Sequence, residues 1–311
     1  MRIVSLQPGA TEIIAALGLT DHLVAVSHEC DHPPTIAGLP VVTRPFTAPT
    51  AASCREIDRT VTERLAVGAP LFEIDAAALA TAGPDLLIVQ DLCHVCGITP
   101  EHLDQALTCL PARPQVVTVG GVTLEEVFLD ILRIGQATGR TEAAESLVDD
   151  LRSRCERVRN RQSARTRRPK VVCVEWLDPF YVAGHWTPEL VALAGGRAVL
   201  GTAGAPSRKV SWDDMVAAEP DVLLVMPCGF TLERTVEELR SSCPALPWDQ
   251  LQAVRHGLVF ALDGNAHFSR PGPRLVDGLE ILEVLLTHER PPASTPPGAQ
   301  LVTWLQDHIK V

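Results

Sequence analysis

Short β-branched strands alternate with helices along almost the whole chain, and this alternation restricts the fold more than any other feature. The predicted strands are Arg2–Leu6, Leu23–Ser27, Leu86–Gln90 and Gln115–Val119 in the first half, and Val171–Trp176, Val222–Met226 and Leu258–Leu262 in the second. Helical segments separate most of these strands, so the connections between them must cross over and return. Crossover connections favour mostly parallel sheets, and the sequence therefore predicts an α/β fold.

The alternation is interrupted once, by the long helical pattern of Thr123–Arg161, which contains a potential break at Gly139. On either side of it, Ala82–Val89 resembles Ala218–Val225, since each combines a helix end, a Pro-Asp turn and a buried strand. This similarity between two segments of the same chain predicts two similar lobes. We place the boundaries at 1–122 for the first α/β lobe, 123–168 for the connecting helix and linker, 169–288 for the second α/β lobe, and 289–311 for a proline-rich tail with a short helix.

Charge and motif content exclude several classes of function. The chain has 311 residues, and its 27 basic and 38 acidic residues give a net charge of −11 and a pI near 5.4. This balance argues against a broad nucleic-acid surface and against adhesion to anionic membranes. No apolar run approaches the roughly 18 residues of a membrane span. The GxSxG, P-loop and strand-following GxGxxG motifs are absent, so the sequence indicates no common enzyme class.

The start of the chain and its cysteines predict a cytoplasmic protein with reduced thiols. The apolar run at Ile3–Leu6 is followed by Pro8, and it is shorter than the roughly 7–15 residues of a signal-peptide core. The nine cysteines are an odd number in a long chain, which does not fit a complete disulfide framework.

Four cysteines, Cys30, Cys93, Cys96 and Cys228, come shortly after three different predicted strands. The carboxyl ends of parallel strands form the ligand-binding edge of such a sheet, so we expect these thiols to converge. Four thiolates suit zinc or an iron–sulfur cluster, and His28 is a further candidate ligand. Two different roles stay open as well: a redox dithiol, which would suit a redox or transfer enzyme, and simple packing of small side chains beside tight turns.

Much of the scarce aromatic content gathers in one short stretch of the second lobe, where a flat macrocycle would find both area and polar contacts. The predicted ligand-binding residues are Trp176, Phe180, Tyr181, His185, Trp186, Phe230, Asn265, His267, Phe268 and Arg270. Arg270 stands near the start of the last long helix, a place suited to a carboxylate or a phosphate. The alternative for each aromatic residue is core packing.

Several of these segments resemble the class III substrate-binding fold of cobalamin and iron-siderophore ABC importers. The resemblance runs from about Ile3 to Leu286 and includes Ser5–Glu12 and Val210–Asp213. Within this superfamily the chain is similar to the subgroup labelled cobalamin-binding proteins. Stretches similar to those of the subgroup are His28–Asp31, Gln90–Cys96, Met226–Gly229 and Asp263–Asn265.

The resemblance implies two Rossmann-like lobes joined by a single long backbone helix, with the ligand in a cleft between them. It also implies a corrinoid as the ligand and an acidic contact with an ABC permease at Asp213, whereas the comparable position of the first lobe is Ala77. We therefore expect a cytoplasmic binding protein for a metal-containing small molecule rather than an enzyme. The ligand is a corrinoid by resemblance, or zinc or an iron–sulfur cluster by the cysteine argument. A substrate-binding role in an ABC importer and an interaction module that signals ligand occupancy to a partner also stay open.

Overall fold

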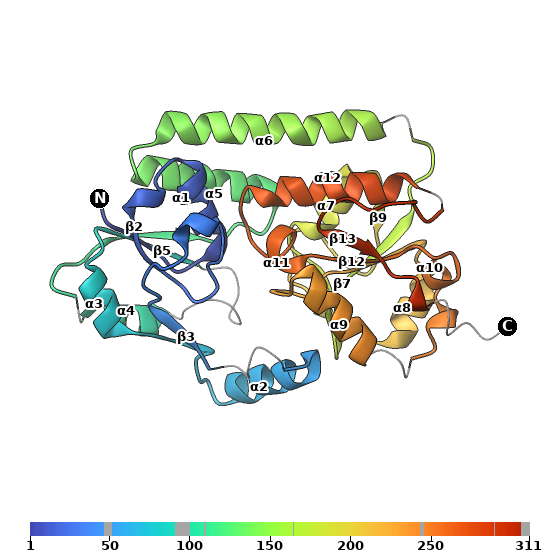
Figure 1. Ribbon diagram of the computed structural model, residues 1–311, viewed down its shortest axis with the longest axis horizontal. Coiled ribbons are helices and arrows are strands. Elements are labelled where there is room, and N and C mark those ends of the chain that lie inside the picture. The colour runs from blue at the N-terminus through green and yellow to red at the C-terminus, as the bar shows by residue number, and fades with distance from the viewer. Residues whose placement is uncertain are drawn as a thin grey trace.

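The first lobe is built on a parallel sheet with the strand order β2-β1-β5-β6 (Figure 1). The structure, a computed structural model, describes residues 1–46, 52–90, 100–108, 110–163, 165–242, 246–288 and 290–305. The strands are β1 (Ile3–Ser5), β2 (Leu23–Val26), β5 (Leu86–Gln90) and β6 (Gln115–Val119). The helices of this lobe are α1 (Pro8–Ala16), α3 (Ala76–Ala82), α4 (Pro100–Thr108) and α5 (Leu124–Ala137), with short 3-10 turns at Thr20–His22 and Pro34–Ile36.

The second lobe has a mixed sheet with the order β10-β8-β7-β11-β12-β13, and β9 pairs with β7 in addition. Its strands are β7 (Lys170–Leu177), β8 (Phe180–Val182), β9 (Arg197–Ala198), β10 (Arg208–Lys209), β11 (Val222–Val225), β12 (Val259–Leu262) and β13 (Ala299–Leu301). Its helices are α7 (Thr187–Leu193), α8 (Trp212–Ala218), α9 (Leu232–Ser242), α10 (Gln252–Arg255), α11 (Gly264–His267) and α12 (Arg274–Thr287), with a 3-10 turn at Trp248–Gln250. Strands β9, β7, β11 and β12 are parallel, as the crossover helices require.

The long helical pattern forms two helices, α5 and α6 (Thr141–Gln162), because the chain reverses at Gly139. Gly139 has a φ of +69°, a left-handed conformation that favours glycine. The two helices pack closely, since a Cβ atom on Gly135 would lie only 2.3 Å from that of Ala144. Helix α6 then runs along both lobes and forms ion pairs with α12 through Arg154 and Arg161 (Figure 1). The single connecting helix is therefore α6.

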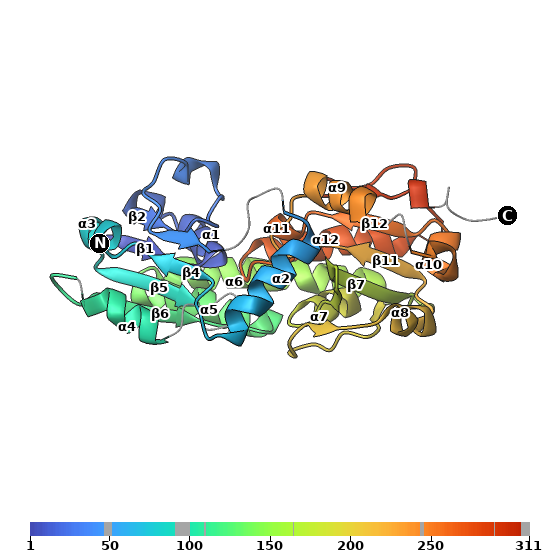
Figure 2. The ribbon, with the colours of Figure 1, turned by 90° about the horizontal axis from the view of Figure 1, so that it is seen from below.

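One segment of the first half leaves its own lobe. Strands β3 (Thr43–Pro45) and β4 (Phe72–Ile74) form a separate antiparallel pair, and the chain between them carries α2 (Cys54–Ala66). Helix α2 lies across the gap between the lobes and reaches the second lobe near β7 (Figure 2). We call β3, α2 and β4 the α2 arm. Its sequence lies within 1–122, but its tip packs in the core of the second lobe, where Cys54 is completely buried.

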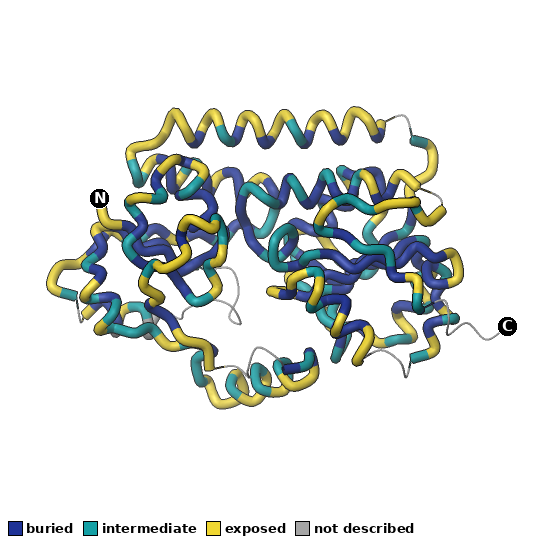
Figure 3. Tube along the Cα trace, viewed as in Figure 1, coloured by how far each residue is buried: buried dark blue, intermediate teal, exposed yellow. Residues whose placement is uncertain are grey.

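Both sheets are buried between helices, and the outer face of α6 is exposed (Figure 3). The predicted fold of two α/β lobes with mostly parallel sheets and one long backbone helix is confirmed. At the end of the chain the structure has the strand β13 at Ala299–Leu301, where the sequence pattern predicts only a proline-rich tail leading to a short helix. Among the described residues, no helix is long and apolar enough to cross a membrane.

Candidate functional site between the lobes

The carboxyl ends of the two sheets meet between the lobes. The turn after β1 begins α1, and a Cβ atom on Gly9 would lie 2.3 Å from the carbonyl oxygen of Pro271. The backbones of the two lobes therefore touch at this point, and only glycine allows such an approach. Gly264, which follows β12, packs equally closely on the carbonyl oxygen of Pro227, which follows β11. Parallel strands place their following loops at one edge, and here the two edges face each other.

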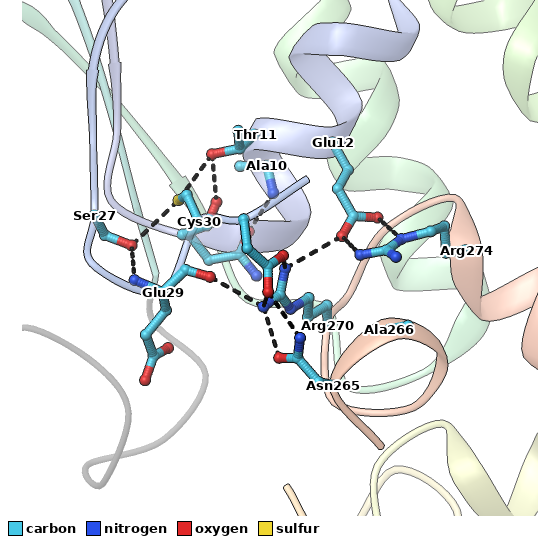
Figure 4. A network of polar contacts seen from close by, with 12 residues as sticks. Ala10, Thr11, Glu12, Ser27, Glu29, Cys30, Asn265, Ala266, Arg270 and Arg274 are labelled. Carbon is cyan, nitrogen blue, oxygen red and sulfur yellow. Dashed lines mark hydrogen bonds and ion pairs between the residues drawn. The ribbon is translucent and has the colours of Figure 1, made fainter. Parts of the chain in front are cut away.

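A polar network of Glu12, Asp31, Asn265, Arg270 and Arg274 joins these edges (Figure 4). The side chain of Arg270 is only 6% exposed, and its guanidinium donates to both carboxylate oxygens of Asp31, one of them at 2.9 Å. It also donates to the carbonyl oxygen of Glu29 at 3.0 Å and to the side-chain oxygen of Asn265 at 2.6 Å. The amide of Asn265 donates to Asp31 at 2.8 Å. Residues from both lobes therefore accept hydrogen bonds from the same arginine, Arg270.

Glu12 forms the second half of this inter-lobe network. Its side chain is 3% exposed and accepts two hydrogen bonds from Arg274, at 2.6 and 3.0 Å, while Arg270 lies 3.7 Å away. Burial raises the pKa of Asp31, but the hydrogen bonds and charge of Arg270 outweigh burial and hold that pKa below its usual value. The network consequently contains two arginines from one lobe and two carboxylates from the other.

The α2 arm makes a second inter-lobe contact. The backbone N–H of Cys54 donates to the Glu238 carboxylate at 3.1 Å, and its carbonyl accepts from the Trp176 indole at 3.1 Å. Arg55 forms an ion pair with Asp178 at 2.7 Å. Trp176 and Asp178 belong to the β7–β8 hairpin, so the arm docks beside the carboxyl end of β7.

Two of the predicted aromatic ligand residues lie next to this arm contact. The Trp176 and Phe230 rings are 5.4 Å apart in an edge-to-face arrangement, and the Arg234 guanidinium stacks over Phe230 at 3.8 Å. Trp176 is half-buried, whereas Phe230 is buried. Trp176 therefore combines an exposed aromatic surface with a position at the inter-lobe edge of the sheet.

The remaining predicted aromatic residues are spread over the second lobe. Phe180 lies 5.9 Å from the ring of Trp212, and Tyr181 pairs with Lys209 in the β8–β10 ladder. Trp186 and Phe268 are buried, and the indole N–H of Trp186 donates to the Phe268 carbonyl at 2.8 Å. These last two residues hold α7 against α11 in the core. Ligand contact by Trp186 and Phe268 stays a prediction, one that needs this packing to open.

The predicted histidines are kept mostly neutral by their surroundings. Burial lowers the pKa values of His185 and His267, and burial likewise lowers that of His28 although Glu29 raises it. His267 packs beneath Gly298, and its ring nitrogen Nδ1 is buried without a partner among the described residues. His28 accepts or donates a hydrogen bond at 2.6 Å with Thr43, at the base of the α2 arm.

Only two of the four cysteines that were predicted to converge, Cys30 and Cys228, lie among the described residues. Cys30 lies in the first lobe, where its sulfur is 3.1 Å from the hydroxyl of Thr11 and burial raises its pKa. Cys228 is exposed in the turn after β11. Cys93 and Cys96 lie outside the described residues. Within the described part of the chain, no group of three or more His, Cys, Asp and Glu side chains is placed to hold a metal ion.

Sequence reasoning missed Glu12, Asp31, Arg274 and the α2 arm as parts of the inter-lobe contact. Asp31 stands next to Cys30, and in that segment the functional role was predicted for the thiol. A usable signal was present, because acids follow the first two strands, while Arg270 precedes the last long helix and Arg274 begins it. Opposite charges at facing strand ends predict an ion-paired interface between the lobes.

A cavity of about 320 Å³ lies elsewhere, beside the amino ends of β7 and β11. Its lining includes Arg165 and Arg167, but both guanidinium groups already have acceptors. Arg165 donates to the carbonyl of Leu286 at 2.8 Å, and Arg167 pairs with Asp221 at 3.0 Å. The first contact secures the segment before β7 to the end of α12, and the second secures it to the start of β11, so the cavity is a feature of the lobe's packing.

Two curated relatives match almost the whole chain. The vitamin B12-binding protein of Vibrio cholerae serotype O1 is 24% identical over 293 residues, which cover 90% of this chain and 86% of the relative. An uncharacterized ABC transporter substrate-binding lipoprotein of Bacillus subtilis is 24% identical over 290 residues, which cover 90% of this chain and 78% of the relative. The relatives therefore include a binder of a small ligand and a protein that serves an ABC transporter.

The fold is shared with solved structures. A periplasmic heme-binding protein from Pseudomonas aeruginosa superposes with a TM-score of 0.70 at 23% identity, covering 96% of each chain. The periplasmic vitamin B12-binding protein of Vibrio cholerae superposes with a TM-score of 0.66 at 23% identity, covering 92% of this chain and 96% of the other. Both likenesses confirm the two-lobed architecture.

The predicted cytoplasmic location is wrong, because the family profile that matches the chain is that of periplasmic binding proteins, and both solved structures named above are periplasmic proteins. The cysteine count misled the prediction: Cys54, Cys155 and Cys173 are buried, and buried thiols say little about the redox state of the compartment. The sequence profile described as "Periplasmic binding protein" matches residues 3–266. This match spans most of the chain, and the chain belongs to the periplasmic binding protein family.

Proposed function

We propose that this chain is the substrate-binding component of an ABC importer and captures a corrinoid between its lobes, outside the cytoplasmic membrane. The observation that carries the proposal is the meeting of strand ends from both lobes, at Gly9 with Pro271 and at Asp31 with Arg270. Ligands of α/β sheets bind at such edges. The vitamin B12-binding and ABC transporter relatives support the ligand class and the role in transport. Heme is the second candidate, because a heme-binding protein shares the fold.

Titration of the purified protein with cyanocobalamin and with hemin tests this proposal. We expect saturable cobalamin binding that quenches tryptophan fluorescence, because Trp176 is half-buried at the inter-lobe edge. The corrin absorption bands should remain with the protein after gel filtration. Absence of saturable binding of both ligands would contradict the proposal.

A matched pair of tryptophan variants sharpens the test. Trp176→Phe should weaken cobalamin binding and remove most of the quenching. Trp304→Phe is the control, because the ring of Trp304 contacts the Arg240 guanidinium, 4.5 Å from its centroid, and none of the predicted ligand-binding residues is its ring partner. Equal losses of affinity in both variants would show that Trp176 has no special role in ligand contact.

Docking to a permease is proposed through one exposed acid on each lobe. Asp213 is exposed in the first turn of α8, and Glu73 is exposed on β4, while the nearby Asp75 is engaged with Arg44 at 2.8 Å. Charge reversal by Asp213→Lys and Glu73→Lys should reduce ligand uptake in cells without changing ligand affinity. Unchanged uptake with both variants would rule out this docking mode.

A further inference from the structure

We propose that Glu12 and Asp31 set the charge selectivity of the inter-lobe site, so that it accepts ligands with uncharged amide side chains and rejects those with free carboxylates. This inference rests on the proposed function, and it distinguishes between its two candidate ligands. A corrinoid such as cobalamin carries carboxamide side chains, whereas heme carries two carboxylates. The structure therefore favours the corrinoid on electrostatic grounds.

Both arginines of the inter-lobe network, the buried Arg270 and the half-buried Arg274, already have hydrogen-bond acceptors. Arg270 has acceptors on Asp31, Asn265 and the backbone of Glu29, and Arg274 is bound by both carboxylate oxygens of Glu12. An incoming carboxylate would have to displace one of these acids. A displaced acid would then remain nearby as a like charge, which is unfavourable.

The arginines of the α2 arm contact are engaged as well. Arg55 is paired with Asp178, and Arg234 stacks on Phe230 and donates to the carbonyl of Ala52 at 2.8 Å. The described arginines that join the two lobes thus all have acceptors.

The charge that a ligand can reach in the inter-lobe site is negative. The side chains of Asp31 and Glu29 are 53% and 62% exposed, and the neighbouring His28 and His32 have pKa values lowered mainly by burial. A carboxamide N–H can donate to the exposed part of Asp31, because a carboxylate accepts several hydrogen bonds. A ligand carboxylate cannot donate, and it meets two acids of its own sign.

The experiment compares cyanocobalamin with a monocarboxylate made from it by hydrolysis of one peripheral amide, and with hemin. We expect the wild-type protein to bind the monocarboxylate at least about tenfold more weakly than cobalamin, a difference of about 1.4 kcal/mol. The ratio should shrink as salt is added, because screening weakens repulsion between exposed charges. Hemin should bind more weakly than cobalamin.

The variant Asp31→Asn should reduce this discrimination, since it removes an acid and releases Arg270 for an incoming carboxylate. Glu125→Gln is the control, because it removes the same charge from an exposed position on α5. Circular dichroism confirms that each variant is folded. The ligand series with the wild-type protein remains decisive even if the Asp31 variant does not fold.

The outcomes separate the two proposals. Equal affinity for cobalamin and its monocarboxylate would overturn the charge selectivity and leave the proposed function standing. Tighter binding of hemin than of cobalamin would also overturn it. Failure to bind any of the three ligands would overturn the proposed function, and the selectivity with it.

Discussion

The two contacts that join the lobes differ in the way they use charge. The inter-lobe network places Glu12 and Arg270, which are 3% and 6% exposed, within a set of mutual hydrogen bonds. The α2 arm instead buries one small residue, Cys54, and surrounds it with solvent-exposed pairs such as Arg55–Asp178, whose arginine is 78% exposed. One contact has a buried ion-paired centre at Glu12 and Arg270, and the other is a docked helix with exposed ion pairs at its edge.

This difference predicts that ion pairs in the two contacts contribute different amounts to the free energy of unfolding. Removal of one partner from a buried ion pair leaves a charge without compensation, which costs about 3–5 kcal/mol. An exposed pair contributes about 0–1 kcal/mol. We therefore expect the network to hold the lobes together and the α2 arm to undock first, in a local opening that leaves the rest of the fold intact.

The largest expected effect is that of Glu12→Gln. It leaves Arg274 and Arg270 without their buried acid, and we expect the free energy of unfolding to fall by about 3–5 kcal/mol. Urea denaturation followed by circular dichroism measures the change. The control is Glu125→Gln, which removes one side of the exposed pair with Arg152 and should cost at most about 1 kcal/mol. Similar costs for both variants would contradict the distinction between buried and exposed ion pairs.

A dependence on pH is the second prediction. The pKa of Asp31 is below its usual value of 3.8, because the bonds from Arg270 outweigh burial. Its stabilising effect is therefore fully present above that usual value and is lost as the pH falls through the lowered pKa. Urea midpoints measured from about pH 6 down to about pH 2 should fall at the acid end, and Asp31→Asn should flatten this fall. An unchanged acid slope in the variant would exclude Asp31 as a source of the dependence.

The third prediction uses Cys54 as a reporter of the α2 arm. Burial raises the pKa of its thiol, so alkylation requires the arm to undock. Trp176→Phe removes the hydrogen bond to the Cys54 carbonyl, worth about 1 kcal/mol, and should speed the alkylation of Cys54 about fivefold. Peptide mass spectrometry follows the reaction, with the buried Cys173 as internal reference. If both cysteines accelerate equally, the opening is global and does not belong to the arm.

The smallest expected effect is that of Arg55→Ala. Its ion pair with Asp178 lies at the exposed rim, so the loss should be below about 1 kcal/mol and the alkylation of Cys54 should rise by less than about fivefold. Added salt should reproduce most of this change in the wild-type protein, because it screens the pair. A larger effect than that of Trp176→Phe would reverse our ranking of the arm contacts.

The local pattern of the sequence was enough to predict many elements. The strands Leu86–Gln90 and Gln115–Val119 have the predicted bounds, and the predicted break at Gly139 separates α5 from α6. These features depend on side-chain periodicity, on helix caps such as Thr123 and on the positive φ of glycine, all of which act between near neighbours. The resemblance to a known superfamily supplied the two-lobed arrangement, and the comparisons confirm it.

The short strands β8, β9, β10 and β13 were not predicted, because two or three residues carry too little pattern and are fixed by their partners in the sheet. The predicted ligand-binding residues lie in different surroundings. Arg270 and Asn265 take part in the inter-lobe network, while Trp186 and Phe268 are packed in the core. Ligand contact by all four stays a prediction.

By itself the sequence determined the order of strands and helices, the parallel sheets and the break at Gly139, because these follow from interactions between residues close in the chain. Only the tertiary structure decided that Asp31 pairs with Arg270 and that Cys54 docks beside Trp176, pairs separated by 239 and 122 residues. Such contacts depend on how two lobes and an arm orient around α6, and every charged residue has many possible partners until that geometry is fixed. The electrostatic character of the inter-lobe site is therefore a property of the folded molecule.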